Sequence, residues 1–363
     1  MGIKQIIFKT EGAIGRTLSH KKIWLISDRE MSAGDNGEAF FRYLQDKDVC
    51  SVFAISKKSK DYDRMRRIGR VVDYDSLQYK VLLCCAECHC SSQLIHMENH
   101  RETPQIFLQH GVAEKDISKM INPASHKNFY IVTSAKDEAD YMKSDNFTIS
   151  PDHVLLTGLA RHDYLKNDPQ KLIVIAFTWR ASLAGIMEKE FEDSDYYKNL
   201  CRIMQDQQLA EKLKEMGYSL KIRLHPEMEQ YLSMLPKNEN WDFYTGSYNQ
   251  MFAQASLIVT DYSSAVFDFA YLKKPILYYQ FDGDEFYDNS PFIAKGFFEY
   301  DKHGFGPVTG SYDEFAEQLI DMAGKGCVME EKYQNRVDDF FAFRDKNNCE
   351  RIYRSVKEIL DKN

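Results

Sequence analysis

The sequence of 363 residues has no uninterrupted run of about 18 apolar residues, the length that a membrane-spanning helix needs. Its first 22 residues have no long apolar core and no small-residue cleavage site, which excludes a secretory signal. Eight cysteines are too few for a disulfide scaffold at this length, so we expect a reduced, cytosolic compartment. Basic residues are not in excess either: 47 Lys and Arg against 55 Asp and Glu give a net charge of −8, which disfavours nucleic-acid binding.

What is present is typical of a globular protein, with 44% hydrophobic and 28% charged residues. The length predicts about two domains at ~150 residues each. The N-terminal segment 1–22 places five Lys and Arg beside isoleucines and Phe8. Two interpretations stay open for it: a basic amphipathic helix on an anionic membrane, or a capping helix or frayed terminus.

A cysteine-rich stretch, CCAECHC, places Cys84, Cys85, Cys88, His89 and Cys90 at a spacing that resembles a metal site. Zinc sites usually draw two of their ligands from a second pair, and the sequence contains no such pair. Cys84 and Cys85 also continue the apolar run VLL, where cysteine acts as a small buried residue. The pattern favours a structural core over zinc.

Short apolar runs alternate with helical patterns along the chain, which predicts βαβ units and parallel sheets. The predicted strands cover 22–27, 50–56, 104–110, 128–134 and 153–158, then 171–178, 218–225, 241–244, 256–260 and 275–280. The predicted helices include 36–45, 195–217 with Gly217 as its C-cap, 264–272 and much of the chain after Tyr312. A polar stretch at 166–170 reads as a linker. We therefore expect an α/β protein of two Rossmann-like domains facing a cleft, over 1–166 and 167–345, followed by a C-terminal helix at 346–363.

Ligands of open parallel sheets bind beyond the carboxyl ends of the strands, so the residues that follow each strand are the informative ones. Five predicted strands end in side chains that can bind anions or move protons. They are His110; Arg161 with His162 and Asp163; Arg180 after Trp179; His225; and Asp261 with Ser263 and Ser264. One histidine at a strand end is more often structural, but five such ends in both halves favour a functional site.

The segment SLIVTDYSSAVFD (256–268) has two interpretations. Asp261 or Ser263 is a suitable helix cap. Alternatively, Thr260, Ser263 and Ser264 are donors beside the free N–H groups of a helix start, which would make a phosphate or diphosphate site without the glycines of a P-loop.

Seven segments between residues 22 and 308 carry a recognisable pattern. They read KIWLISDREMSAGDNGEAFFRYL, FLQHGVAEKDI, VLLTGLARHDYL, IAFTWR, IRLHPE, VTDYSSAVFDFAYLKKPILYYQFDGDEFYD and GFGPV. On these segments the chain resembles the CDP-glycerol glycerophosphotransferase family, which builds teichoic acids and related phosphopolyol polymers. Two departures concern the acceptor and the polyol: Val112-Ala113 replaces a Thr-Pro after the His-Gly pair, and Ala160-Arg161-His162-Asp163 replaces Pro-Arg-Asn-Asp. Long polymerases of the family carry extra N-terminal segments, so we expect a minimal version.

The resemblance implies a glycosyltransferase-B fold with the donor nucleotide in the C-terminal half and the acceptor in the N-terminal half. It implies that an acceptor hydroxyl attacks the β-phosphorus of CDP-glycerol and releases CMP. His110 would be the general base, since histidine titrates near neutral pH. His225 would bind the donor phosphates, with help from Arg223.

The remaining candidate residues are predicted to bind the donor, and some of them have two alternative roles. Thr260, Ser263 and Ser264 would hold the diphosphate, and Arg180 would bind phosphate or stack, or else form a salt bridge. Asp261 and Arg161 are further donor or acceptor candidates, and the role of Arg161 is the less defined. Asp268 and the acidic run 282–285, which includes Glu285, would contact the ribose or hold a loop.

No cofactor is required by this scheme. A diphosphate donor makes Mg²⁺ an option, but side chains and helix dipoles are expected in its place. The partners expected are CDP-glycerol, a lipid-linked or polymeric acceptor and, through residues 1–22, the cytoplasmic face of a bacterial membrane, with no nucleic acid. CDP-ribitol or a nucleotide-sugar donor, or a non-catalytic polymer-binding relative, are the alternatives.

Overall fold

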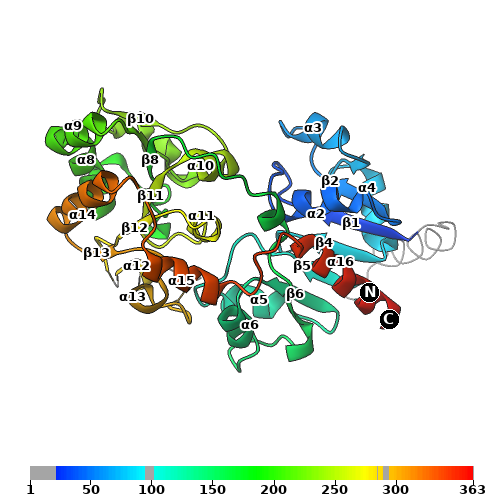
Figure 1. The fold of residues 1–363 in the computed structure, drawn as a ribbon. Helices are drawn as coiled ribbons and strands as arrows, with labels where there is room; N and C mark the ends of the chain where they lie inside the picture. Colours follow the sequence, from blue (N-terminus) through cyan, green and yellow to red (C-terminus); the bar gives the residue numbers. More distant parts are fainter. Residues whose placement is uncertain (1–21, 95–101, 284, 289–293, 363) are drawn as a thin grey trace. The chain divides into compact units, whose positions relative to one another are not determined.

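The computed structural model describes residues 22–94, 102–283, 285–288 and 294–362. Its contacts divide the chain into two compact units (Figure 1). The first unit comprises 1–112, 118–164 and 341–363, and the second comprises 113–117 and 165–340. The predicted division placed residues up to 345 in the second domain and set the C-terminal helix apart, whereas in the structure residues 341–363 pack with the first unit.

The first unit contains a seven-stranded parallel sheet in the order β3-β2-β1-β4-β5-β6-β7. The strands are β1 (Ile23–Ser27), β2 (Cys50–Ala54), β3 (Val71–Val72), β4 (Cys88–Ser91), β5 (Gln105–Phe107), β6 (Phe129–Thr133) and β7 (Val154–Leu156). The helices are α2 (Asn36–Leu44), α3 (Tyr62–Arg66), α4 (Leu77–Cys85), α5 (Ser118–Ala124), α6 (Lys136–Met142) and α16 (Asn348–Lys362), with short 3₁₀ turns η1 (Pro151–His153) and η2 (Ala160–Tyr164).

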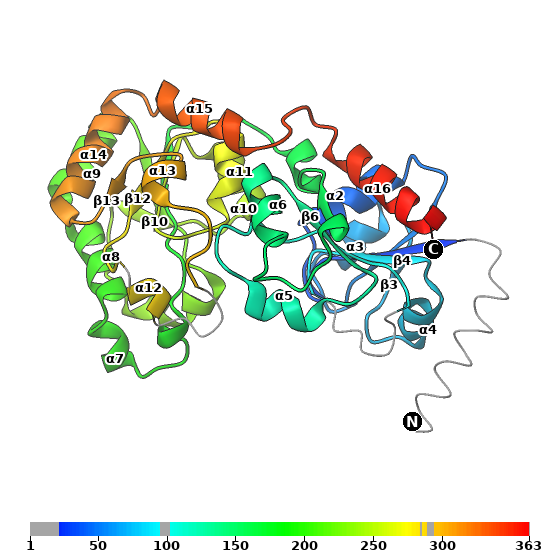
Figure 2. The same cartoon turned by 90° about the horizontal axis from the view of Figure 1, so that it is seen from below.

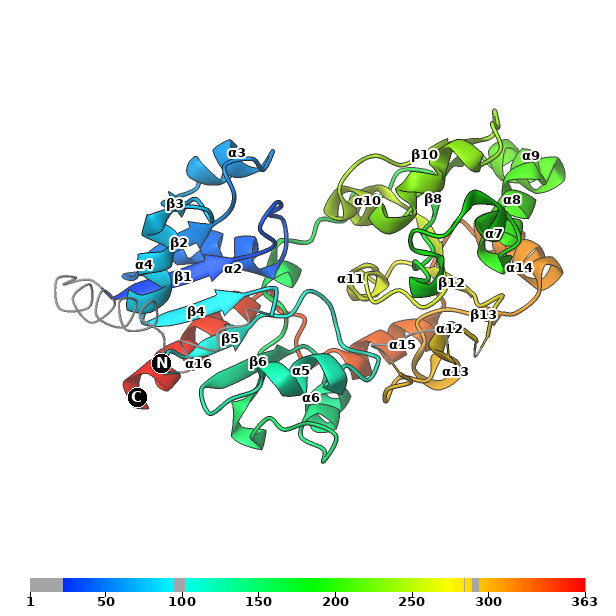
Figure 3. The same cartoon turned by 180° about the vertical axis from the view of Figure 1, so that it is seen from behind.

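Side-chain alternation along β1 explains how this sheet is covered on both faces. Trp24 packs against Phe40 of α2 and Tyr353 of α16, at ring separations of 6.3 and 5.6 Å. Its neighbour Leu25 belongs to a different buried cluster, with Leu82 of α4. Helices α16 and α4 therefore cover opposite faces of the first sheet (Figure 3).

The second unit contains a six-stranded parallel sheet in the order β10-β9-β8-β11-β12-β13. The strands are β8 (Leu172–Ile175), β9 (Ser219–Ile222), β10 (Trp241–Phe243), β11 (Leu257–Thr260), β12 (Ile276–Tyr279) and β13 (Val308–Thr309). The helices are α7 (Glu188–Glu192), α8 (Asp195–Gln205), α9 (Gln207–Glu215), α10 (Tyr248–Gln254), α11 (Val266–Tyr271), α12 (Glu285–Asp288), α13 (Tyr300–His303), α14 (Tyr312–Gly324) and α15 (Glu331–Phe340), with 3₁₀ turns η3 (Ala181–Leu183) and η4 (Pro226–Met234).

Helices α8, α9 and α14 share one buried cluster with β8, β9, β11 and β12, while α10 and α11 lie on the other side of the sheet (Figures 1 and 2). Each sheet begins with the order third, second, first, fourth strand of its unit, as Rossmann folds do. The direction of chain progression therefore reverses between β1 and β4 and between β8 and β11. The prediction of an α/β chain with two parallel, Rossmann-like sheets is confirmed.

Several elements differ from the sequence prediction, among them the short strands β3 and β13, which were not predicted. The predicted helix 195–217 is two helices, because the Asp206 carboxylate accepts the Leu209 N–H and starts α9 one residue after α8 ends. The cysteine-rich stretch ends α4 and then forms β4, a strand that was not predicted. The helix predicted from residue 264 begins only at Val266.

The cysteines match a structural role. All eight are free thiols, and Cys84, Cys88 and Cys90 are buried. In the part of the chain that the structure describes, no three or more His, Cys, Asp and Glu side chains gather as a metal site would need. No described helix combines the length and the apolar character that crossing a bilayer would take. Residues 1–21, and with them nearly all of the proposed membrane segment, lie outside the described residues.

Candidate active site

His110 follows β5 in the first unit, and its imidazole faces a carboxylate. Its Nδ1 lies 3.5 Å from Asp35 Oδ2, and half of its side chain is exposed. Arg161 is buried and places one guanidinium nitrogen 2.5 Å from Asp35 Oδ1 and 2.8 Å from the His110 carbonyl oxygen. The first unit thus brings His110 and Arg161 together through Asp35, with the imidazole open to a reactant.

Gln109 and Asn36 hold the turn that carries His110. Gln109 has φ of +58°, a left-handed conformation that costs a non-glycine residue energy. Its side-chain amide donates to the Val132 carbonyl at 2.5 Å and to Glu138 Oε1 at 2.9 Å, which stabilises that conformation. Asn36 donates to the Gln109 carbonyl and accepts the Arg161 N–H, each at 2.9 Å. The turn is therefore held from three segments of the chain.

Asp28, at the end of β1, organises the loop that ends in Asp35. Its carboxylate accepts the backbone N–H groups of Asp35, Gly37 and Glu38 at 2.8–3.1 Å and the Ser92 hydroxyl at 2.5 Å. Burial raises the pKa of Asp28 to about 7, and repulsion from Asp35 adds to this rise, while the hydrogen bonds oppose it. A Cβ at Gly37 would lie 2.3 Å from the Ser27 carbonyl oxygen, so only glycine lets α2 start this close to β1.

Residues of the motif TGLARHD contact both the segment around His110 and the start of α16. Gly158 has φ of +80°, and a Cβ there would lie 2.0 Å from Asn348 Oδ1. Asp163 accepts the backbone N–H groups of Asn348 and Cys349 at 3.0 and 2.8 Å, so it caps the start of α16. Only Arg161 of this motif reaches His110 in the interactions above, and His162 packs edge-on against Phe341.

In the second unit, the first part of the TDYSS segment is buried and already hydrogen-bonded. The Thr260 hydroxyl donates to the Ala176 carbonyl at 2.7 Å. Asp261 accepts the Thr178 and Tyr262 N–H groups at 2.8 and 2.7 Å. Both residues have no exposed surface, so they join β11 to β8 at the reversal point of the sheet.

Arg180 lies between two carboxylates. Its guanidinium is 2.8 Å from Asp261 Oδ2 and 2.6 Å from Asp282 Oδ2, and its side chain is 8% exposed. Burial opposes its charge, but Asp261 and Asp282 together raise the pKa of Arg180 above its usual value. The phosphate role predicted for Arg180 stays a prediction. In the structure its charge is matched by two carboxylates, and it connects the ends of β8, β11 and β12.

Ser263 and Ser264 are the accessible part of the same segment. Both are partly exposed, in the turn between β11 and α11. Ser263 Oγ accepts the Ala265 N–H at 3.3 Å, and the carbonyl groups of Ser263 and Ser264 accept the first N–H groups of α11. A helix-cap role thus accounts for Ser263 in part, and the diphosphate contact of Ser264 stays a prediction.

Lys115 supports this turn from the segment 113–117. Its ammonium donates to the Tyr262 carbonyl at 2.6 Å, forms an ion pair with Glu114 and lies 5.7 Å from the Phe286 ring centroid. Tyr262 stacks on Phe286 at 4.2 Å. The residue before Ser263 is therefore held on both its backbone and its side chain.

His225 follows β9 and begins η4. Its Nδ1 accepts the Glu227 N–H at 3.3 Å, so the neutral ring carries its proton on Nε2, where it can be donated. The ring stacks on Trp179, with 5.8 Å between centroids and 18° between planes. Arg223 points elsewhere: it donates to the Tyr244 and Gly246 carbonyls at 3.0 and 3.2 Å and lies over the Tyr248 ring. The structure thus gives Arg223 a role in holding the chain after β10.

The acidic candidates separate by exposure. Asp268 is buried on α11, and Glu285 is exposed at the start of α12. Burial raises the pKa of Asp282, while Arg180 opposes that rise. Asp282 forms an ion pair with Arg180. A ribose contact by Asp268 or Glu285 stays a prediction.

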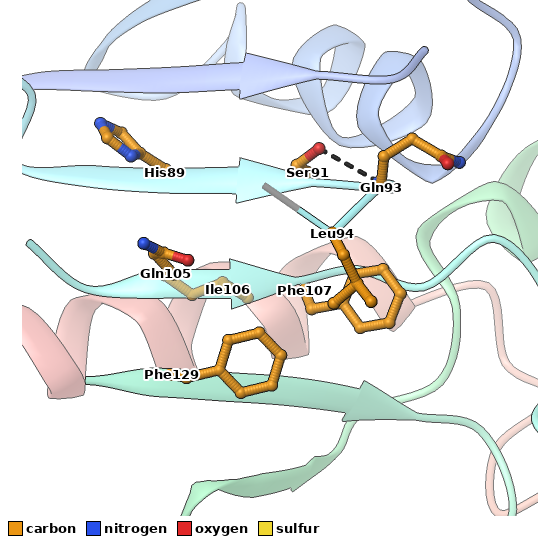
Figure 4. A pocket seen from close by; sticks show the side chains of 8 residues that line it. All are labelled: His89, Ser91, Gln93, Leu94, Gln105, Ile106, Phe107 and Phe129. Carbon is orange, nitrogen blue, oxygen red and sulfur yellow. Dashed lines mark hydrogen bonds between the residues drawn. The ribbon is translucent and has the colours of Figure 1, made fainter. Parts of the chain in front are cut away.

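A small pocket lies on the first sheet, away from these side chains (Figure 4). It is lined by His89, Ser91, Gln93, Leu94, Gln105, Ile106, Phe107 and Phe129. The lining side chains come from β4, β5 and β6 and from Gln93 and Leu94 of the loop after β4, and Ser91 Oγ accepts the Gln93 N–H at 3.1 Å. None of the predicted site residues lines it, so the candidate site remains at the strand ends.

Comparison with known proteins decides the family. Residues 10–358 match the model of the CDP-Glycerol:Poly(glycerophosphate) glycerophosphotransferase family. The chain belongs to this family. It is 33% identical to the minor teichoic acid biosynthesis protein GgaB of Bacillus subtilis, over 94% of this chain and 40% of that protein. It is 23% identical to the teichoic acid ribitol-phosphate polymerase TarL of Staphylococcus aureus, over 65% of this chain and 42% of that protein.

The chain thus spans less than half the length of these two relatives. A solved structure of the wall teichoic acid polymerase TagF has the same fold, with a TM-score of 0.69 and 16% identity over 99% of this chain and 96% of that chain. The resemblance inferred from the seven segments is confirmed as family membership.

Sequence reasoning missed three residues that the structure places at the candidate site. Asp35 and Asn36 stand within the segment SAGDNGEAFF. Eight residues separate β1 from α2, so neither Asp35 nor Asn36 directly follows a strand. Lys115 follows His110 by five positions, and no strand end marks it. The signal available was an acidic residue just before a helical pattern, which is typical of an N-cap.

Proposed function

We propose that this chain transfers glycerol phosphate from CDP-glycerol to a hydroxyl of a lipid-linked or polymeric acceptor in teichoic acid synthesis. The observation that carries the proposal is the half-exposed His110 imidazole, oriented by Asp35, in a chain of the glycerophosphotransferase family. An imidazole with its other nitrogen held by a carboxylate is suited to accept a proton from a hydroxyl.

The step balances as a substitution at phosphorus. His110 takes the proton of the acceptor hydroxyl, and that oxygen forms a new bond to the β-phosphorus of CDP-glycerol. The bond from the β-phosphorus to the bridging oxygen breaks, and CMP leaves with that oxygen. Ser264 and the Nε2–H of His225 would bind the phosphate oxygens, where charge develops. No step in this scheme needs a metal ion.

The donor assignment is supported by a solved structure of a histidine-to-asparagine variant of TagF soaked with CDPG. CDP-ribitol is the second candidate donor, because TarL is named a ribitol-phosphate polymerase. Contact with the membrane and a role in capsule synthesis stay predictions from the sequence.

Calorimetry tests the donor site. CDP-glycerol, CDP-ribitol, CDP and a UDP-sugar are titrated into the wild type, Ser264→Ala and Ser256→Ala, a matched control at the opposite end of β11. We expect the Kd for CDP-glycerol to rise about tenfold or more in Ser264→Ala, since a hydrogen bond to a charged group contributes about 1.5–3 kcal/mol. Preference for CDP-ribitol would change the donor and keep the mechanism. Absence of binding by any cytidine nucleotide would contradict the proposal.

A transfer assay with His110→Ala tests the base. The variant is expected to bind CDP-glycerol as the wild type does and to lose transfer by a factor of about 10²–10⁴, the usual contribution of a general base. Transfer at the wild-type rate would remove His110 from the mechanism.

A further inference from the structure

A strongly basic stretch of the first unit has no part in the site described so far. Residues 57–70 contain seven Lys and Arg and two Asp, a net charge of +5 in a chain whose net charge is −8. Six of the seven basic side chains are exposed, and we call them the basic surface: Lys57, Lys58, Lys60, Arg66, Arg67 and Arg70. The seventh, Arg64, is bound by Glu38 and Asp61.

The charge of the basic surface is poorly compensated by neighbouring acids. Lys57 lies 3.9 Å from Asp73, and Lys58 lies 3.7 Å from Asp75. Both lysines are exposed and both distances are long for an ion pair, so these contacts contribute little. Among the residues that the structure describes, the ion pairs include none for Lys60 or for the three arginines. The surface therefore attracts anions.

The chain segment that carries the basic surface is hydrogen-bonded to the loop that ends at Asp35. The Ser56 N–H donates to the Glu30 carbonyl and the Ser59 hydroxyl to the Met31 carbonyl, each at 2.9 Å. The Ala33 N–H donates to Asp61 at 3.1 Å. These three bonds join the chain after β2 to the loop 28–35, which ends at Asp35.

The sheet order gives the separation along the edge. His110 follows β5, and the basic surface follows β2, with β4 and β1 between them. Three steps at about 4.8 Å per strand make about 14 Å. Because all four strands are parallel, Lys57, Lys58 and Lys60 stand with His110 at the carboxyl edge of one sheet, where α3 and the loop after β1 are seen in Figure 3. The chain then turns back to the start of β3, so Arg70, just before Val71, lies beside β2 and not at that edge.

We propose that the basic surface binds the phosphodiester backbone of the acceptor polymer and so presents its terminal hydroxyl to His110. The inference rests on the proposed function, since it takes the acceptor to be a polyol-phosphate chain. Such a chain carries one negative charge per repeat, and guanidinium groups bind phosphate oxygens through a matching fork of donors. A one-unit acceptor would occupy only the end of the chain at His110 and would not reach the arginines.

The side chains around the basic surface favour a polyanion over an anionic bilayer. A membrane-binding helix needs apolar side chains beside its basic ones. Within residues 57–70, Met65 is fully buried and Tyr62 and Ile68 are only partly exposed, so the fully exposed side chains of this stretch are polar or charged.

Binding is tested with the full chain and a fluorescent synthetic oligo(glycerol phosphate), by anisotropy at several salt concentrations. Two triple variants are used, Lys57→Gln with Lys58→Gln and Lys60→Gln, and Arg66→Gln with Arg67→Gln and Arg70→Gln. The matched control replaces three exposed lysines of the second unit: Lys189→Gln with Lys212→Gln and Lys237→Gln. We expect each test variant to lose about tenfold in affinity at low salt and to show a shallower salt dependence, since fewer counterions are released.

Three results would overturn the inference. The first is an oligomer affinity in the test variants equal to that of the wild type. The second is an equal loss in the lysine control. The third is a loss of binding to phosphatidylglycerol vesicles with unchanged oligomer binding, which would make this a membrane surface.

Kinetics separate this inference from the proposed function. With a one-unit acceptor, the test variants should transfer glycerol phosphate as the wild type does, while kcat/KM falls for the long acceptor. If the wild type binds the oligomer but transfers nothing from CDP-glycerol, the proposed function fails and the polymer-binding surface stands.

Discussion

Asp35 is the residue on which the arrangement around His110 depends. Its two carboxylate oxygens face different partners, His110 on one side and Arg161 on the other. It also caps α2 by accepting the Asn36 N–H at 2.8 Å. One side chain thus connects the helix start, the candidate base and the motif at 158–163.

Asp35→Asn is therefore expected to impair transfer without affecting the donor. The amide keeps the size of the side chain but loses the charge that faces His110, and kcat should fall by about 10²-fold, within the usual range for acid–base groups. Calorimetry should give an unchanged Kd for CDP-glycerol, because the residues proposed to bind the donor lie in the second unit. Asp63→Asn, an exposed aspartate of α3, serves as control, and a donor Kd that rises together with the loss of kcat would show general damage instead.

Arg180 gives a prediction about stability. Arg180→Met would leave Asp261 and Asp282 buried without their cation, and breaking such a cluster costs about 3–5 kcal/mol of the free energy of unfolding. The exposed pair of Lys325 and Asp321, at 2.6 Å, provides the comparison: Lys325→Met should cost about 0–1 kcal/mol. Urea denaturation of both variants measures the difference, and equal losses would contradict a structural role for Arg180.

At this scale the sequence predicted which side chains stand at strand ends better than which partners those side chains contact. His110, His225 and Ser264 were selected because they follow strands, and all three are at least partly exposed there. Thr260 ends a strand and Arg180 follows one, but their partners are the Ala176 carbonyl and the Asp282 carboxylate, 84 and 102 positions away. Which face of a turn a side chain takes depends on neighbouring strands, and one segment read alone does not contain that information.

Among the elements, the C-terminal end of α10 is hydrogen-bonded by a buried lysine from a distant part of the chain. Lys274 donates to the carbonyls of Phe252 and Ala253 at 2.7 and 2.9 Å, and so satisfies the last turn of the helix. Burial lowers the pKa of Lys274 to about 8, against a smaller opposing effect of Asp168.

This shift predicts a pH dependence of stability. In the unfolded chain the lysine keeps its ordinary pKa of 10.5, so between about pH 8 and 10.5 the unfolded state binds more protons than the folded state. The contribution of Lys274 to the free energy of unfolding should therefore increase as the pH rises through this window. Chemical denaturation of the wild type and Lys274→Met at several pH values isolates it, because buried tyrosines affect both proteins alike. A constant difference between the two proteins would contradict the shift.

Strands with continuous apolar runs were predicted well. Strands without such runs, and helix ends that depend on a single side chain, were predicted poorly. The strands β8 and β11 are continuous runs of buried aliphatic residues. Strand β4 reads CHCS, and its burial comes from β1 and β5 on either side, not from its own hydrophobicity. The break between α8 and α9 comes from a single carboxylate, Asp206, in an otherwise continuous helical pattern.

On the scale of the whole molecule, the C-terminal residues belong to the first unit. Helix α16 packs Tyr353 on Trp24 and is capped by Asp163. The fold class could be predicted from the alternation of strands and helices. The packing of residues 341–363 on the first unit could not, because α16 has the same amphipathic pattern whichever unit it packs on.

A chain that ends at Phe340 should therefore lose stability in the first unit only. Without residues 341–363, Trp24 would be exposed where it is now 1% exposed, and amide hydrogens of β1 and α2 should exchange faster. The Kd for CDP-glycerol should stay unchanged, because the second unit is complete. Hydrogen exchange with mass spectrometry and calorimetry measure the two effects, and faster exchange in β8 and β11 would show that the units depend on each other.

The way the chain passes between the units also has a consequence for its synthesis. The second unit takes 113–117 and 165–340, so all of its residues exist once Phe340 has left the ribosome. The first unit begins earlier in the sequence, yet it still lacks the helix that covers Trp24 at that moment. The first unit therefore cannot complete its fold before every residue of the second unit has been translated.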